Sequence, residues 1–343
     1  MRLKALSACR YPTMVLMVDD NPRFLMHLAA KLDSAFHFKF ETDPRNALSL
    51  MSKKSLLQET LRSCFVGEDS GLELDIQEDA VHQYYRSIHF GNLLKLLENP
   101  DRFNEVSVIV VDYAMPGMNG IELCRALSKH PARKILLTGE ADHRIAVEAF
   151  NEGLIHRFVL KQTQENALYE ELNAVISEMQ NVYFSTSSRR LLSALDLDAL
   201  ASDALLVEEV NRIQAQYQNL EFYLMNSRGT FLLMDETGRP QIFLCESFKT
   251  LESYAQMAQE NGASSVLQKA LLEKTHLPCL FRAKNEDLNF QDWDQALVPI
   301  HLSTESGFFC ALTNQAPYGF ESMKIASYDR FIEKHLKEEM AFK

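Results

Sequence analysis

The chain has 343 residues, of which 46% are hydrophobic and 24% charged. This length is enough for two domains of ordinary size, and the composition is typical of soluble globular proteins. The formal net charge of −12 argues against non-specific nucleic-acid binding, because that binding depends on an excess of basic residues.

The six cysteines are scattered, and none has the Cys-x-x-Cys spacing of a zinc site or the pattern of a disulfide framework. Reduced thiols are therefore the expected state. The N-terminus lacks the apolar core of a secretory signal, and no apolar run of about 18 residues predicts a membrane-spanning helix. We expect a cytoplasmic protein that does not associate with membranes.

From residue 14 onward, apolar segments alternate with amphipathic ones. Strands are predicted at 14–20, 36–42, 106–112, 134–140 and 155–162. Helices are predicted at 21–32, 121–130, 143–153 and 166–180. Five strand–helix repeats are typical of a flavodoxin-like fold, a doubly wound five-stranded parallel sheet with helices on both faces.

Polar side chains stand at the ends of four of these strands: Asp19, Asp20, Asp112, Thr138 and Lys161. Strand ends are often polar simply because they are exposed. Carboxylates gathered at one sheet edge, however, need a cation to stay ionised together, and oxygen ligands in an open site suit Mg²⁺. Aspartate can accept a phosphoryl group, and a lysine with a hydroxyl can bind its oxygens. The pattern indicates metal-assisted phosphorylation of one aspartate.

The segments VDD (18–20), VVDYAMPGMNG (110–120), LLTGEAD (136–142) and FVLKQ (158–162) together resemble the receiver domain of two-component response regulators. The resemblance covers about residues 14–180. It implies that Asp112 is the phosphoacceptor and that Mg²⁺ is the cofactor. It further implies that Asp20 binds the metal directly, Asp19 assists through water, and the carbonyl of Ala114 completes the protein ligands.

The same resemblance implies a switch. Thr138 would supply the switch hydroxyl, Lys161 the cation that binds the phosphoryl group, and Phe158 the aromatic side chain that moves with Thr138. One position departs from the family pattern, because Gln162 replaces the proline that usually follows the lysine in a cis peptide. A cis bond without proline costs about 3 kcal/mol, so we expect a trans peptide here.

A second departure is the long segment at about 52–105 between the second and third predicted strands, which is far longer than one crossover helix requires. We expect one or two extra helices in it, partly within 80–100. The segment is either a decorative insertion or a contact surface for a kinase, a second subunit or the output domain.

We assign the receiver domain to 12–182 with this insertion, a helical linker to 183–219 and an output domain to 220–343. The output domain is predicted to be α+β, with an antiparallel sheet. A three-stranded meander spans 221–247. Helices follow from 248 and 265, further strands are expected at 278–283, 296–302 and 307–314, and a charged helix ends the chain.

The sequence therefore predicts a response regulator, phosphorylated by a sensor histidine kinase or a phosphotransfer protein, with no enzymatic activity beyond its own phosphorylation. Its layout resembles atypical proteobacterial response regulators of the Legionella quorum-sensing type. The output domain would bind a protein or a small ligand, and the phosphorylated chain could form a homodimer. The alternatives are a DNA-binding transcriptional regulator and an enzymatic, nucleotide-handling output domain. Residues 185–343 contain 15 Lys and Arg against 22 Asp and Glu, a net charge of −7, and no helix-turn-helix pattern, which disfavours DNA binding.

Overall fold

The computed structural model describes residues 2–65, 88–139, 142–161, 165–217, 219–282 and 293–341. The chain divides into two compact units. The first unit contains Met1–Arg2, Pro12–Arg62 and Asp101–Ser187, and the second contains Leu3–Tyr11, Ser63–Pro100 and Ser188–Lys343. The described part of the long insertion is divided between the units, with 52–62 and 101–105 in the first and 63–65 and 88–100 in the second, whereas the sequence-based boundaries placed all of it in the receiver domain.

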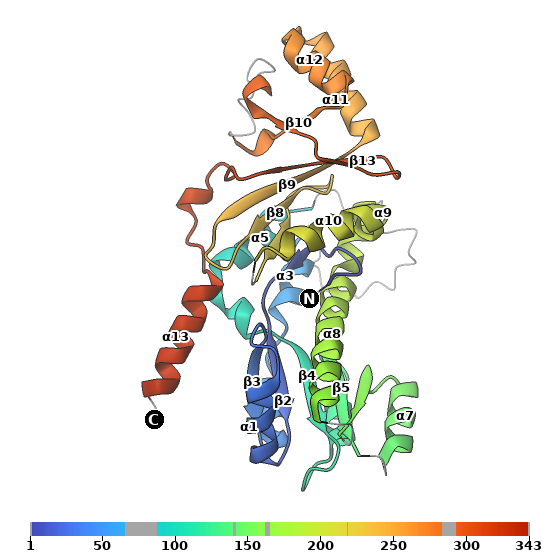
Figure 1. The fold of residues 1–343 in the computed structure, drawn as a ribbon, viewed down its shortest axis with the longest axis vertical. Helices are drawn as coiled ribbons and strands as arrows, with labels where there is room; N and C mark the ends of the chain where they lie inside the picture. The colour runs from blue at the N-terminus through green and yellow to red at the C-terminus, as the bar shows by residue number, and fades with distance from the viewer. Residues whose placement is uncertain are drawn as a thin grey trace. The chain divides into compact units, whose positions relative to one another are not determined.

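The first unit is built on a five-stranded parallel sheet with the strand order β3-β2-β4-β5-β6. The strands are β2 (Met14–Val18), β3 (His37–Glu41), β4 (Val106–Asp112), β5 (Arg133–Thr138) and β6 (Arg157–Leu160) (Figure 1). Strand β4 is buried along its whole length, as expected for a central strand covered on both faces. This strand order confirms the flavodoxin-like fold.

Helices cover both faces of this sheet. Helices α1 (Pro22–Lys31) and α8 (Glu165–Ala194) pack their apolar side chains on one face. Helices α2 (Pro44–Leu50), α6 (Gly120–Ala126) and α7 (His143–Asn151) cover the other face. Side chains alternate along each strand, so Val108 and Val110 of β4 contribute to one core and Ile109 and Val111 to the other.

The insertion contains the extra helical structure that its length predicts. Helix α3 spans Leu56–Ser63, α5 spans Phe90–Leu94, and 3₁₀ turns follow at Lys95–Glu98 and Pro100–Asn104. The helix expected within 80–100 is described only from residue 88 onward, because 66–87 lie outside the described residues. Within the second unit, Ala326 donates a backbone hydrogen bond to the carbonyl of Leu97.

The second unit contains a six-stranded antiparallel sheet with the order β1-β7-β8-β9-β13-β12. Its strands are β1 (Cys9–Arg10), β7 (Glu221–Leu224), β8 (Phe231–Met234), β9 (Pro240–Ser247), β12 (Leu302–Ser303) and β13 (Phe308–Thr313). Strands β7, β8 and β9 form the predicted meander. Strand β1 was not predicted; it lies at the edge of this sheet, where Cys9 pairs with Tyr223.

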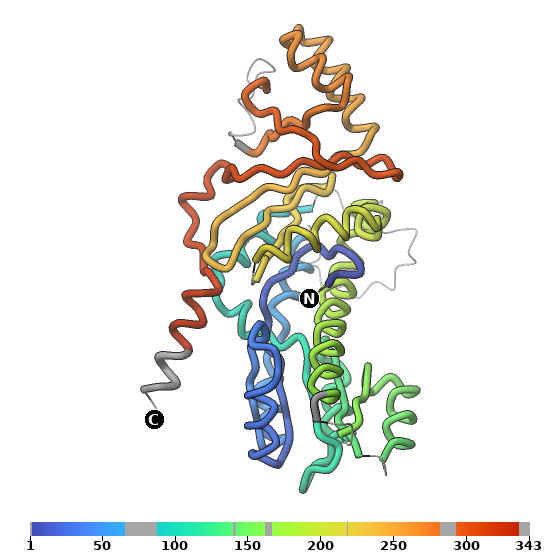
Figure 2. Tube along the Cα trace, viewed as in Figure 1, coloured from blue at the N-terminus to red at the C-terminus, as the bar shows by residue number. Residues whose placement is uncertain are grey.

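Helices α9 (Asp198–Ser202), α10 (Ala204–Gln214), α11 (Phe248–Glu260), α12 (Ser265–Leu272) and α13 (Tyr328–Ala341) complete this unit. The N-terminal segment runs beside α9 and α10, where the backbone N–H of Leu3 donates to Asn211 and that of Leu6 to the carbonyl of Ala201 (Figure 2). Among the described helices, none combines the length and the apolar character that crossing a membrane requires.

One strand prediction is wrong. The strand expected at 278–283 is instead the end of β10 (His276–Pro278), followed by a 3₁₀ turn at Leu280–Arg282. Among the described strands, β10 pairs only with β11 (Leu297–Pro299), which lies within the strand predicted at 296–302. The ladder between β10 and β11 ends just after Pro278, with the hydrogen bond that the N–H of Cys279 donates to the carbonyl of Ala296 at 2.8 Å, and the chain then turns.

Candidate functional site

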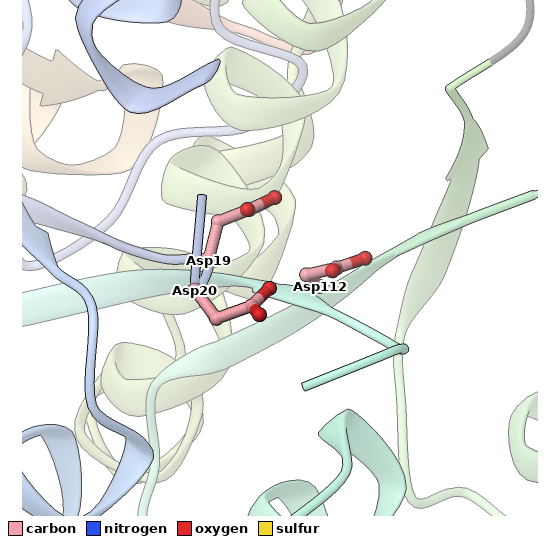
Figure 3. Close-up of side chains that lie close together, drawn as sticks. All are labelled: Asp19, Asp20 and Asp112. Atoms are coloured by element: carbon pink, nitrogen blue, oxygen red, sulfur yellow. The ribbon is translucent and has the colours of Figure 1, made fainter. Parts of the chain in front are cut away.

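The predicted acidic residues meet at the carboxyl edge of the parallel sheet. Asp19 and Asp20 follow β2, and Asp112 ends the neighbouring strand β4. One ligand oxygen from each carboxylate lies within 4.8 Å of the other two, and the three side chains project in the same direction (Figure 3). The helices after these two strands cover opposite faces of the sheet, so the cluster lies at the switch point where ligands of open α/β sheets bind.

Lys161, which follows β6, joins two of these carboxylates. Its Nζ lies 2.6 Å from Oδ2 of Asp19 and 2.9 Å from Oδ1 of Asp112. Both aspartates are buried, with 1% and 5% of their surface exposed. Because buried carboxylates need a partner of opposite charge, the ammonium compensates part of the negative charge of the cluster.

Asp19 is held by the main chain as well. It accepts a hydrogen bond from the backbone N–H of Asn21 at 2.9 Å. Burial raises the pKa of Asp19, while the hydrogen bonds from Lys161 and Asn21 lower it. Burial is the largest of these contributions, so the carboxylate of Asp19 is harder to ionise than an exposed carboxylate.

The donor set fits a hard divalent cation. Asp20 is exposed, and no described residue makes a hydrogen bond or an ion pair with its carboxylate. Within the described backbone, no hydrogen bond reaches the carbonyl of Ala114. Mg²⁺ binds carboxylate and carbonyl oxygens and keeps several waters, so an open cluster with free oxygen donors suits it.

The switch residues lie on the neighbouring strands. Thr138 ends β5 with 1% of its surface exposed, and its hydroxyl donates to the carbonyl of Gly139 at 3.3 Å. The backbone N–H of Lys161 donates to the carbonyl of Thr138 at 2.9 Å, which couples the two predicted phosphoryl-binding residues through the main chain. Phe158 is half-buried, with its ring edge-to-face against His143 at 5.3 Å between centroids.

Three site residues were missed by the sequence analysis. Asn21 caps α1, since its Oδ1 accepts from the N–H groups of Arg23 and Phe24 at 3.1 and 3.3 Å. In the first turn of the capped helix, the ring of Phe24 lies 4.6 Å from Nζ of Lys161, within the range of a cation–π contact. An Asn-Pro pair directly after the two aspartates was the available signal for the cap.

The third missed residue is Gly120, at the start of α6. Its N–H donates to the carbonyl of Tyr113 at 3.0 Å, which closes the loop after Asp112. A Cβ at Gly120 would lie 2.4 Å from the carbonyl oxygen of Asp112 and 2.9 Å from Cδ1 of Leu136. Only glycine allows this approach, so the MPGMNG segment holds the phosphoacceptor strand and α6 together.

Part of the predicted site cannot be compared with the structure. Gln162 lies outside the described residues, so the trans conformation expected for the Lys161–Gln162 peptide stays a prediction. The structure therefore brings together Asp19, Asp20, Asp112 and Lys161, and it places Thr138 on the adjoining strand.

Comparison with known proteins agrees with this geometry. The family model of the response regulator receiver domain matches residues 82–173. That range includes Asp112, Thr138 and Lys161, whereas Asp19 and Asp20 precede it because the long insertion separates them from the third strand. No curated protein matches the chain.

Among solved structures, the chain is similar to the response regulator LqsR of Legionella pneumophila, with 26% identity, a TM-score of 0.76, and coverage of 97% of each chain. Two other similar structures cover about half of this chain. An adenylate cyclase from Rhodopirellula baltica has 24% identity and a TM-score of 0.34, and covers 53% of this chain and 98% of its own. The receiver domain of the Francisella response regulator 1452 has 16% identity and a TM-score of 0.31, with coverage of 50% and 98%.

The flavodoxin-like sheet, the acidic cluster at its switch point, the family match and the whole-length similarity to LqsR lead to one conclusion: this chain contains the receiver domain of a two-component response regulator.

Proposed function

We propose that this protein is a phosphorylation-dependent response regulator in which Asp112 accepts a phosphoryl group from a histidine kinase or a phosphotransfer protein. The observation that supports this most directly is the arrangement of Asp112 with Asp19, Asp20 and Lys161 at one sheet edge. A structural ion pair would require only one acid for one lysine. Three acids around one lysine leave a surplus of negative charge that suits a divalent cation.

The transfer joins an oxygen of Asp112 to phosphorus while the P–N bond of the donor phosphohistidine breaks and the leaving imidazole takes up a proton. Lys161 holds Oδ1 of Asp112, and within the described chain no residue makes a hydrogen bond or an ion pair with Oδ2. Oδ2 is therefore the oxygen available for attack, and the ammonium fixes the orientation of the carboxylate.

Bound Mg²⁺ would supply charge neutralisation for the incoming phosphoryl oxygens. Asp20, Asp112 and the carbonyl of Ala114 would hold it directly, with Asp19 assisting through water. Lys161 then exchanges its contact with Asp112 for a phosphoryl oxygen, and Thr138 turns its hydroxyl toward another. Phe158 follows into the space that Thr138 leaves, which changes the surface formed by β6 and α7.

The phosphoryl group adds a charge of about −1.5 to −2, which biases this switch. We further propose that the switch acts on an output unit that binds a protein or a small ligand in quorum-sensing signalling. We place the protein in the cytoplasm and propose that its phosphorylation favours a homodimer. The similarity to LqsR supports the output role. No other catalytic activity is proposed.

The test is to incubate the full chain with Mg²⁺ and acetyl phosphate and to follow its mass. Wild-type protein should gain one phosphoryl group, and Asp112→Asn should gain none. Asp20→Asn keeps the acceptor and should react only at higher Mg²⁺ concentrations. If the wild type and Asp112→Asn remain equally unmodified under conditions that label a control receiver, the proposed function is wrong. Size measurements with beryllofluoride then test for the dimer.

A further inference from the structure

A groove on the first unit is separate from the acidic cluster. It lies between the end of α2, the start of α3 and the segment that follows α6, and it encloses about 720 Å³. Helices α2 and α6 begin at the carboxyl edge of the sheet and run back toward its amino edge. The groove thus lies at the end of the sheet away from Asp112. We propose that it binds a phosphorylated small molecule of nucleotide size.

Basic side chains dominate this groove. Lys53, Lys54, Arg62 and Lys129 line it and are exposed, and Glu59 is the one acidic residue among its lining residues in the described chain. The whole chain carries a formal net charge of −12, so the charge of the groove is opposite in sign to that of the chain as a whole. A cleft lined by charges of one sign attracts ligands of the opposite sign.

A buried cation lies behind the groove and adds to this potential. Lys134 is 3% exposed, and its ammonium donates to the carbonyl of His130, a lining residue, at 3.3 Å and to that of Ala132 at 3.5 Å. No carboxylate neutralises Lys134 in the described chain. Its charge adds to the positive potential beside His130, because low-dielectric surroundings screen it weakly.

The remaining lining residues suit the organic part of such a molecule. Leu48, Met51, Leu127 and Pro131 supply apolar surface, and Ser52 and Gln58 supply polar groups. Ligand sites of about 300–1,000 Å³ commonly combine an apolar wall with a few polar anchors. Lysines act as point charges toward phosphate, and a nucleotide-sized molecule fits the enclosed volume.

One wall of the groove is fixed in place before any ligand binds. Oε2 of Glu105 accepts from the N–H groups of Leu56 and Leu57, at 2.8 and 3.3 Å, and so caps α3. Oε1 of the same carboxylate accepts from the hydroxyl of Tyr183 at 2.6 Å. Because α3 is anchored to the start of β4 and to α8, Gln58 and Arg62 are presented from a rigid helix.

The test is calorimetric titration of the full chain with adenosine diphosphate and with pyrophosphate, in EDTA to remove divalent cations from the acidic cluster. The double variant Lys53→Gln/Arg62→Gln should bind about tenfold more weakly or worse, because charge-assisted contacts are lost. Glu59→Gln should bind several-fold more tightly, since it removes the opposing charge and frees Lys54, whose Nζ lies 3.7 Å from Oε1 of Glu59. If these side chains only maintained the structure, the two variants would not change the affinity for the probes in opposite directions.

The matched control is Lys31→Gln/Lys249→Gln, two exposed lysines outside the groove, which should bind like the wild type. Asp112→Asn and Lys161→Ala should also leave the affinity unchanged, which would distinguish the groove from the phosphoacceptor site. The proposal is overturned if the wild type binds neither probe, if binding depends on Lys161 rather than on the groove, or if a hexaglutamate peptide binds while both phosphate probes do not.

Discussion

The ammonium of Lys161 lies 2.9 Å from Oδ1 of Asp112, the residue proposed to accept the phosphoryl group. The same ammonium is 2.6 Å from Oδ2 of Asp19, so one lysine contacts two buried carboxylates and compensates part of their negative charge. Lys161 therefore provides in the unphosphorylated site part of the positive charge that a divalent cation would bring.

Replacing Lys161 by methionine should make the protein depend more strongly on Mg²⁺. The variant leaves Asp19 and Asp112 without their cation, which should cost about 1–2 kcal/mol of unfolding free energy after allowance for the partial exposure of the lysine. Added Mg²⁺ should raise the melting temperature of Lys161→Met more than that of the wild type. Lys39→Met, a partly exposed lysine on β3, is the control, and equal Mg²⁺ responses of all three proteins would contradict this account.

Phe24 should lengthen the lifetime of the phosphorylated state. Its ring lies 4.6 Å from Nζ of Lys161 and restrains the ammonium that would contact the phosphoryl group. Phe24→Ala should shorten the half-life of the phosphoaspartate about threefold, in line with a cation–π contact of roughly 0.5–1 kcal/mol. The measurement is loss of the phosphoryl mass after removal of the donor. Phe24→Tyr keeps an aromatic face and should behave like the wild type; a half-life as short as that of Phe24→Ala would exclude the ring contact.

Gly120→Ala should destabilise the first unit and impair phosphorylation together. The added Cβ would meet the carbonyl of Asp112 at 2.4 Å, so the backbone at the acceptor must move. We expect a loss of about 2 kcal/mol or more, measured by urea unfolding. Gly91→Ala is the matched control, because a Cβ at that helical position meets no atom within 4 Å. It should be neutral or slightly stabilising, and similar losses in both variants would refute the close-approach argument.

Two half-buried histidines, His130 and His156, should make stability depend on pH. Burial lowers the pKa of His130 and of His156 to about 4, with further lowering by Lys134 in both cases. Between pH values of about 6.5 and 4 the unfolded chain therefore binds protons that the folded chain does not, and stability falls as the pH falls through this range. Each histidine should contribute on the order of 2 kcal/mol to that loss.

The measurement is the urea midpoint at about pH 7 and pH 5, the two sides of the unfolded-state histidine pKa. His156→Asn should show a smaller difference between the two, because the amide oxygen can still accept the N–H of Lys134 that His156 Nδ1 accepts at 3.0 Å. His27→Asn replaces an exposed histidine and should retain the full difference. An unchanged pH dependence in His156→Asn would assign the effect to other groups.

Much of the site could be predicted from the sequence because parallel strands place their ends at one edge. Once Asp19, Asp20 and Asp112 followed apolar runs of a strand–helix repeat, their proximity was a consequence of the fold, and Lys161 joined them for the same reason. These positions depend on element order and not on side-chain packing, so local patterns were sufficient.

Contacts between distant side chains could not be predicted in this way. The ring of Phe24 lies 4.6 Å from Nζ of Lys161, and no periodicity of the sequence encodes that distance. Strand β1 is two residues long and its partner is far away in the chain, so it has no local pattern of its own. The strand expected at 278–283 is wrong because an apolar run carries no signal for the 3₁₀ turn at Leu280–Arg282, which follows the end of β10.

The pairing of Cys9 with Tyr223 has a consequence for how this protein is made. The ribosome releases β1 (Cys9–Arg10) long before β7 (Glu221–Leu224), so β1 stays without its partner strand until more than half of the chain has been synthesised. A fragment beginning at residue 188 would leave the backbone of β7 without its neighbour, and unpaired edges promote aggregation. Neither unit therefore corresponds to one continuous stretch of the gene, because each is assembled from several separate segments of the chain.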